Sequence, residues 1–199
     1  VEDDTNGVVS KRLELMKDAL SQRGKNALER DSGMSLEDEY SEKLQAYVDE
    51  VTAKQSNDAQ RGMFKKQSDA LINQMKSSLS SHVIEQQKVF ENETDTASMG
   101  KAVDQATLLW GDEGMRAQSM AKITEVIDKQ ASRNGWDKAI RDEKLQAALS
   151  PMHVGILNSM IKANMPPEQI KDYYSNNSAS MTVQARAHVQ DLIQNATET

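Results

Sequence analysis

Apolar residues recur at every third or fourth position along most of this chain of 199 residues. This spacing places them together on one face of an α-helix. The alternation of apolar and β-branched residues with polar ones that indicates a strand is not sustained over five positions anywhere in the sequence. The pattern therefore predicts an all-α protein, with long helices followed by a compact bundle of helical hairpins.

Turn and capping residues divide the first part of this pattern. We expect an irregular lead-in over residues 1–7, followed by a helix over residues 8–28 that Gly24 weakens and residues 31–33 end. A second helix begins after Ser35, whose hydroxyl can accept a hydrogen bond from the backbone N–H three residues later. The first part of the chain is thus expected to hold two helices before the long third one.

The third segment is the longest, and Asn57 or Asp58 is expected to cap it. It extends to Trp110 with few turn residues, and an acidic, Thr-rich stretch at 92–95 is a candidate break. Polar residues such as His82 interrupt its apolar face, which predicts a loosely packed seam and not a tight coiled coil. We expect that face to be a self-association or partner surface, made by Phe64, Leu71, Met75, Leu79, Val83 and Phe90.

After a turn at 111–114 the predicted helices are shorter. One ends at Gly135, which suits the left-handed position after a helix. Ser150 and Pro151 are expected to begin a new helix, as an N-cap followed by proline at the first helical position. These features predict two regions, an extended long-helix region at 1–110 and a compact helical-hairpin region at 111–199.

The distribution of proline supports the helical assignment. All three prolines lie after residue 150, and a proline inside a helix costs about 3 kcal/mol. A chain that avoids proline for so long is therefore expected to be mostly helix.

Composition narrows the classes of function. The net charge is −7, which argues against binding to nucleic acid through phosphate neutralisation. The chain has no cysteine, and no apolar run approaches the roughly 20 residues of a transmembrane helix. Phosphate-loop, dinucleotide and nucleophile-elbow motifs are missing, and the three histidines lie far apart in the sequence. We expect no cofactor, no metal site and no catalysis in this segment.

Two stretches carry a resemblance to a known family. The first is residues 57–64 with the long polar helix that follows to Phe90, and the second is 150–157 followed by 165–174. In both, the chain is similar to the internal (ejection) virion proteins of short-tailed bacteriophages. The resemblance covers most of the chain from Asn57 onward, and it brings no functional residues with it.

That family implies a structural protein that is stored in the virion and delivered into the host envelope or cytoplasm during genome ejection. Its expected partners are further copies of itself and other virion or envelope proteins. One alternative is a bacterial cytoplasmic scaffold or adaptor that binds a partner protein through the long helix. Another is an enzyme or a regulatory domain, for which the mark would be a concave pocket gathering two or more titratable groups.

Overall fold

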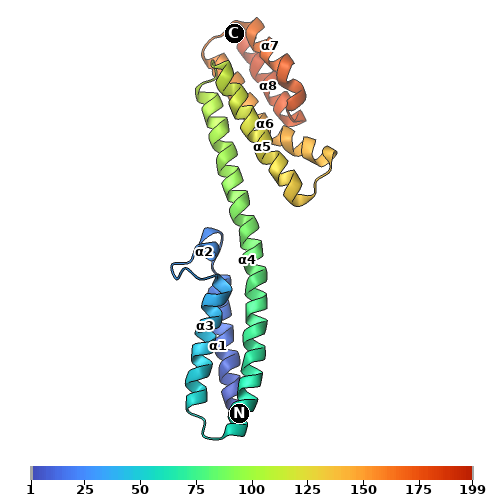
Figure 1. Cartoon of the computed structure of the whole chain (residues 1–199). Helices are drawn as coiled ribbons and strands as arrows, with labels where there is room; N and C mark the ends of the chain where they lie inside the picture. The colour runs from blue at the N-terminus through green and yellow to red at the C-terminus, as the bar shows by residue number, and fades with distance from the viewer. Residues whose placement is uncertain (1, 199) are drawn as a thin grey trace. The chain divides into compact units, whose positions relative to one another are not determined.

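The computed structural model describes residues 2–198, which form α-helices and one short 3-10 helix without any strand (Figure 1). This confirms the all-α class. The elements are α1 (Glu2–Leu20), α2 (Lys25–Leu28), α3 (Leu36–Ala53), α4 (Asp58–Leu108), α5 (Glu113–Asn134), α6 (Lys138–Lys162), α7 (Pro167–Asn177), η1 (Ser178–Ser180) and α8 (Val183–Thr197).

The helices form two compact units that divide after Glu93. The division lies inside α4, which continues as one helix through the candidate break at 92–95. Sequence patterning placed the boundary near Gly111 instead. The difference has a physical reason, because Ala102 and Ala106 in the last turns of α4 are buried in the core of the second unit.

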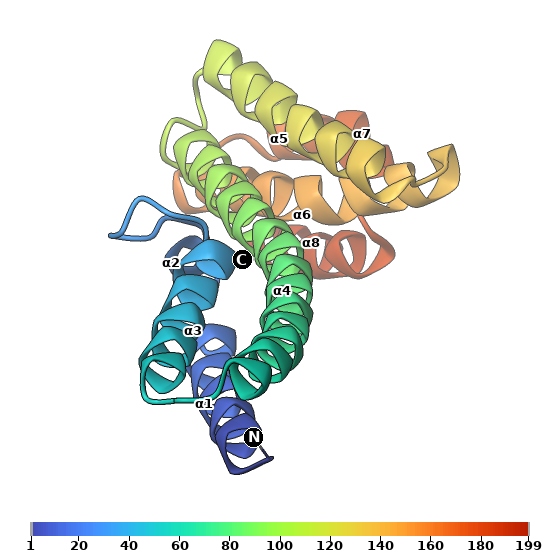
Figure 2. The ribbon, with the colours of Figure 1, turned by 60° about the horizontal axis from the view of Figure 1, so that its bottom comes forward.

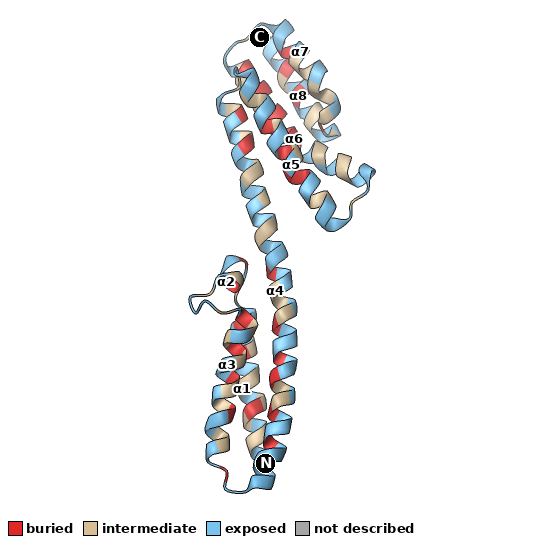
Figure 3. Cartoon of the chain, in the orientation of Figure 1, coloured by how far each residue is buried: buried red, intermediate tan, exposed pale blue. Residues whose placement is uncertain are grey.

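In the first unit, α1, α3 and the beginning of α4 lie side by side (Figures 1 and 2). Phe64, Met75 and Leu79 of α4 are completely buried in its core, and Leu71 and Val83 pack against that core. Buried positions along this part of α4 are drawn in red in Figure 3. The predicted self-association face is thus covered within the chain by α1 and α3. Of its six residues only Phe90 lies outside this core, half-buried on α4, so we do not keep this face as a partner surface.

Polar residues on that face hold the loop between α1 and α2. The Gln86 side chain accepts a hydrogen bond from the Gly24 N–H at 2.7 Å. The Nε2 atom of His82 lies 2.7 Å from the Gln22 carbonyl oxygen. These contacts explain why polar residues interrupt the apolar face, since they satisfy backbone groups of a loop that packs against it.

Two expectations for the beginning of the chain are wrong. Residues 2–7 are helical, because Val8 is buried in the core and the acids Glu2, Asp3 and Asp4 suit the first turn of a helix. The helix predicted over 8–28 ends instead at Leu20, and Gly24 takes a positive φ of 54° before the short α2.

Three of the expected caps are present. The Ser35 hydroxyl accepts a hydrogen bond from the Asp38 N–H at 3.2 Å. The Asn57 side chain accepts from the N–H groups of Ala59 and Gln60 at the start of α4. Gly135 ends α5 in the left-handed conformation, with φ 66°.

In the second unit, the end of α4 and helices α5 to α8 surround one apolar core. Ser150 and Pro151 were predicted to begin a helix, but both lie inside α6. The neighbouring Ser150 hydroxyl donates to the Gln146 carbonyl at 2.7 Å and accepts from the Thr182 N–H at 2.9 Å. The first bond lies within α6, and the second ties its proline turn to the start of α8, which offsets part of the cost of the proline.

Candidate functional site

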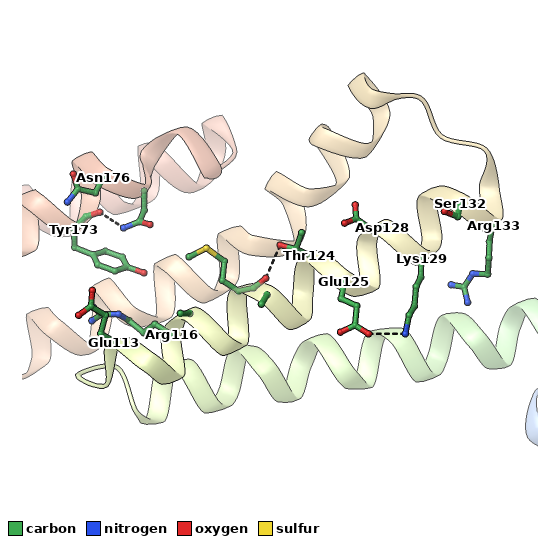
Figure 4. Close-up of a pocket in the computed structure, with 14 residues that line it drawn as sticks. Glu113, Arg116, Thr124, Glu125, Asp128, Lys129, Ser132, Arg133, Tyr173 and Asn176 are labelled. Atoms are coloured by element: carbon green, nitrogen blue, oxygen red, sulfur yellow. Dashed lines mark hydrogen bonds and ion pairs between the residues drawn. The ribbon is translucent and has the colours of Figure 1, made fainter.

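An open groove of about 1230 Å³ lies in the second unit, along one face of α5 and beside α7 (Figure 4). Its lining residues recur every three or four positions along α5, so they share one side of the helix. The residues are Glu113, Arg116, Ala117, Met120, Ala121, Thr124, Glu125, Asp128, Lys129, Ser132 and Arg133 of α5, with Tyr173, Asn176 and Asn177 of α7.

The position of α5 follows from its two faces. Asp112 caps the helix by accepting a hydrogen bond from the Met115 N–H at 3.0 Å. The opposite face buries Ile123, Val126 and Ile127, which leaves the groove face toward solvent. Ala117 and Ala121 in its middle are exposed, and these two small side chains leave room for another helix to approach this part of α5.

Charged residues lie toward both ends of this groove face. At one end, the Arg116 side chain donates to the Trp110 carbonyl at 2.8 Å, and its guanidinium carbon lies 5.5 Å from the centre of the Tyr173 ring. At the other end, Lys129 pairs with Glu125 at 3.0 Å. The Asp128 carboxylate accepts from the Arg141 Nε at 2.8 Å.

The groove therefore gathers several titratable groups, which was the mark proposed for an enzyme. Their electrostatics differ from those of a general acid. The Lys129 ammonium, which hydrogen-bonds Glu125, and the charge of Lys122 lower the pKa of the Glu125 carboxyl. Burial raises the pKa of the Tyr173 hydroxyl to about 12. A general acid–base group needs a pKa near the working pH, whereas these shifts keep Glu125 ionised and Tyr173 protonated.

His153 of α6 contacts Tyr173, one of the residues that line the groove. It is completely buried, and its Nδ1 atom is 2.9 Å from the Tyr173 hydroxyl. Burial lowers the pKa of this histidine from 6.5 to about 4. His153 therefore stays neutral near pH 7 and helps to hold α7 against α6.

Sequence reasoning missed this groove because it followed the apolar positions of α5, which are the buried ones. The available signal was the small pair Ala117 and Ala121, with charges flanking it on the same helical face. Within residues 2–198 no three histidine or acidic side chains come close enough together to hold a metal ion.

No family model, curated protein or solved structure matches this chain. Over the described helices, none combines the length and apolar character needed to span a bilayer.

Proposed function

We propose that this chain is a helical structural protein that acts by assembling with other protein chains, and that the groove face of α5 is its assembly surface. The supporting observation is the makeup of that face, in which small exposed residues lie between charged ones. A second helix could lie on such a face with its charges near those at the two ends.

The charges suit a second copy of the same helix. In an antiparallel pair of α5 helices related by a twofold axis, residues at equal distances from the axis lie opposite each other. With the axis between Met120 and Ala121, Arg116 faces Glu125 of the second copy, and this contact occurs twice.

The outer charges are compatible with the same register. In this register Glu113, for which the described chain offers no ion pair, lies opposite Asp128 of the second copy, with Lys129 next to it. The negative charge of Asp128 is compensated by Arg141 within its own copy. The homo-oligomer expected from the sequence is thereby proposed for α5 in place of α4.

A charge exchange tests this assembly. We expect wild-type protein to associate reversibly in sedimentation velocity as its concentration rises. Arg116→Glu and Glu125→Arg should each raise the dissociation constant about 10- to 30-fold, because each attraction becomes a repulsion and occurs twice. The double variant should return toward the wild-type value, since the pair forms again with reversed polarity.

Glu143→Arg is the matched control, because Glu143 is exposed on α6 and does not line the groove. It should leave the dissociation constant within about twofold of wild type. A double variant as weak as the single ones, or a wild-type protein that remains monomeric at about 1 mM, would contradict the proposal.

For the setting of this assembly, we propose the particle of a short-tailed bacteriophage, with delivery into the host during ejection. This proposal rests on the sequence resemblance and on a helical chain without cysteine, which can unfold and refold without rearranging disulfides. Mass spectrometry of purified particles should detect the protein. The same measurement on particles after ejection should show that the protein has been lost. If it is found instead only in the bacterial cytoplasm, the scaffold or adaptor function takes its place.

A further inference from the structure

A second, smaller hollow of about 340 Å³ lies between α4 and α5, within the second unit. It uses a different side of α5 from the assembly face. Its lining residues are Ser98, Lys101, Ala102 and Gln105 of α4 with Met115, Gln118, Ser119 and Lys122 of α5.

Ser119 is the unusual member of this set. It is only 2% exposed, and its hydroxyl oxygen has no hydrogen-bond partner among the described residues. A serine inside a helix commonly donates to the carbonyl four residues earlier, as Ser150 does toward Gln146. A buried hydroxyl without a partner is unfavourable. Because less than 1 Å² of the Ser119 oxygen is accessible, its side chain must rotate toward the hollow to bond a ligand there.

The charges around the hollow have one sign. Lys101 and Lys122 are its only charged lining residues, in a chain whose net charge is −7. Lys101 has no ion pair within the described part of the chain, and Lys122 makes only a long contact with Glu125, at 4.0 Å. Both ammonium groups therefore retain donors for a ligand.

The remaining polar groups are also donors. The amides of Gln105 and Gln118 and the hydroxyl of Ser98 line the hollow together with Ser119. Two lysines repel a metal cation, and an uncharged apolar ligand would leave these donors unsatisfied. An anion with several acceptor oxygens is attracted by the two lysines and accepts hydrogen bonds from these donors.

We propose that this hollow binds a small oxyanion of the phosphate class, held by Lys101 and Lys122 and by a hydrogen bond from Ser119. The site lies on other residues than the α5 assembly face, so it stands or falls independently of the proposed function.

The test is a titration of the whole chain with inorganic phosphate, followed by backbone amide NMR at constant ionic strength with chloride as the balancing anion. We expect saturable shifts concentrated at residues 98–105 and 115–122. Lys101→Gln with Lys122→Gln should weaken binding about tenfold or more, because two charge-assisted hydrogen bonds are lost. Ser119→Ala should weaken it about 2- to 10-fold, through the loss of one hydrogen bond.

The matched control carries Lys162→Gln and Lys171→Gln, which remove the same charge from exposed positions of the same unit. It should change phosphate affinity by less than about twofold, since exposed charges act weakly through solvent. Equal weakening in the control, an unchanged affinity in the Ser119 variant, or shifts spread over all surface lysines would overturn the site. Circular dichroism at each step confirms that the variants remain helical.

Discussion

Acid should selectively destabilise the second unit through His153. This side chain is completely buried, and its Nε2 atom has no hydrogen-bond partner among the described residues. Protonating it would place a charge in the apolar core between α6 and α7. The folded state therefore binds this proton more weakly than the unfolded state does, as the lowering of the pKa from 6.5 to about 4 indicates.

The sign and size follow from that shift. A group whose pKa is lower in the folded state contributes stability that is fully present above its unfolded pKa, here near 6.5, and is lost as the pH falls toward about 4. The full loss corresponds to about 3 kcal/mol at roughly 1.4 kcal/mol per pKa unit. About 2 kcal/mol of it should already be lost at pH 5, above the range in which most carboxylates titrate.

Tryptophan fluorescence is a selective assay, because both tryptophans, Trp110 and Trp136, belong to the second unit. Urea unfolding should show a midpoint about 1–2 M lower at pH 5 than at pH 7, for a slope of roughly 1–2 kcal/mol per molar urea. His153→Gln, which cannot titrate, should lose most of this pH dependence. His188→Gln should keep it, since His188 is exposed on α8.

Two results would refute the reasoning. One is a His153→Gln variant that loses as much stability between pH 7 and pH 5 as wild type does. The other is a direct NMR titration of the His153 ring with a midpoint near 6.5, the ordinary value for this residue. The NMR measurement remains decisive even if the substitution itself impairs folding, because it uses the wild-type chain.

Other substitutions test the packing of each unit by urea unfolding. A Cβ at Gly155 would collide with the Thr107 side chain, so Gly155→Ala should lower the free energy of unfolding by about 1–2 kcal/mol. In a Thr107→Ala background the same substitution should be neutral or stabilising, because alanine favours helix. Glu39→Gln removes an ion pair that Arg30 makes at 2.7 Å and should cost the first unit about 1–3 kcal/mol at pH 7, as measured by circular dichroism. Since Arg30 lowers the pKa of Glu39 below 4.5, that contribution is present above about pH 4.5 and is lost as the pH falls further, so wild type and variant should converge in acid. Gly24→Ala should lower the free energy of unfolding by about 1–2 kcal/mol, because φ there is 54°. A single variant that is as stable as wild type would contradict the estimate made for it.

The periodicity of the chain was enough to predict an all-α protein, and local capping residues predicted three of its helix caps. Ser35, Asn57 and Gly135 act where local chemistry placed them, because a cap depends on a few neighbouring residues. The positions at which helices begin and end were less predictable. Pro151 lies inside α6, next to Ser150, which bonds this turn to the start of α8, and the partner of that bond is far away in the sequence.

The use of each helical face was decided by tertiary structure. The apolar stripe of α4, with Phe64, Met75 and Leu79, indicates only that a partner must cover it, and α1 and α3 of the same chain do so. Conversely, the sequence shows Ala117 and Ala121 as small residues flanked by charges, but only the packing of the opposite face of α5 decided that this face is exposed. Helix formation follows from local spacing and capping, whereas the partner of a helical face depends on contacts between distant segments, which one sequence does not record.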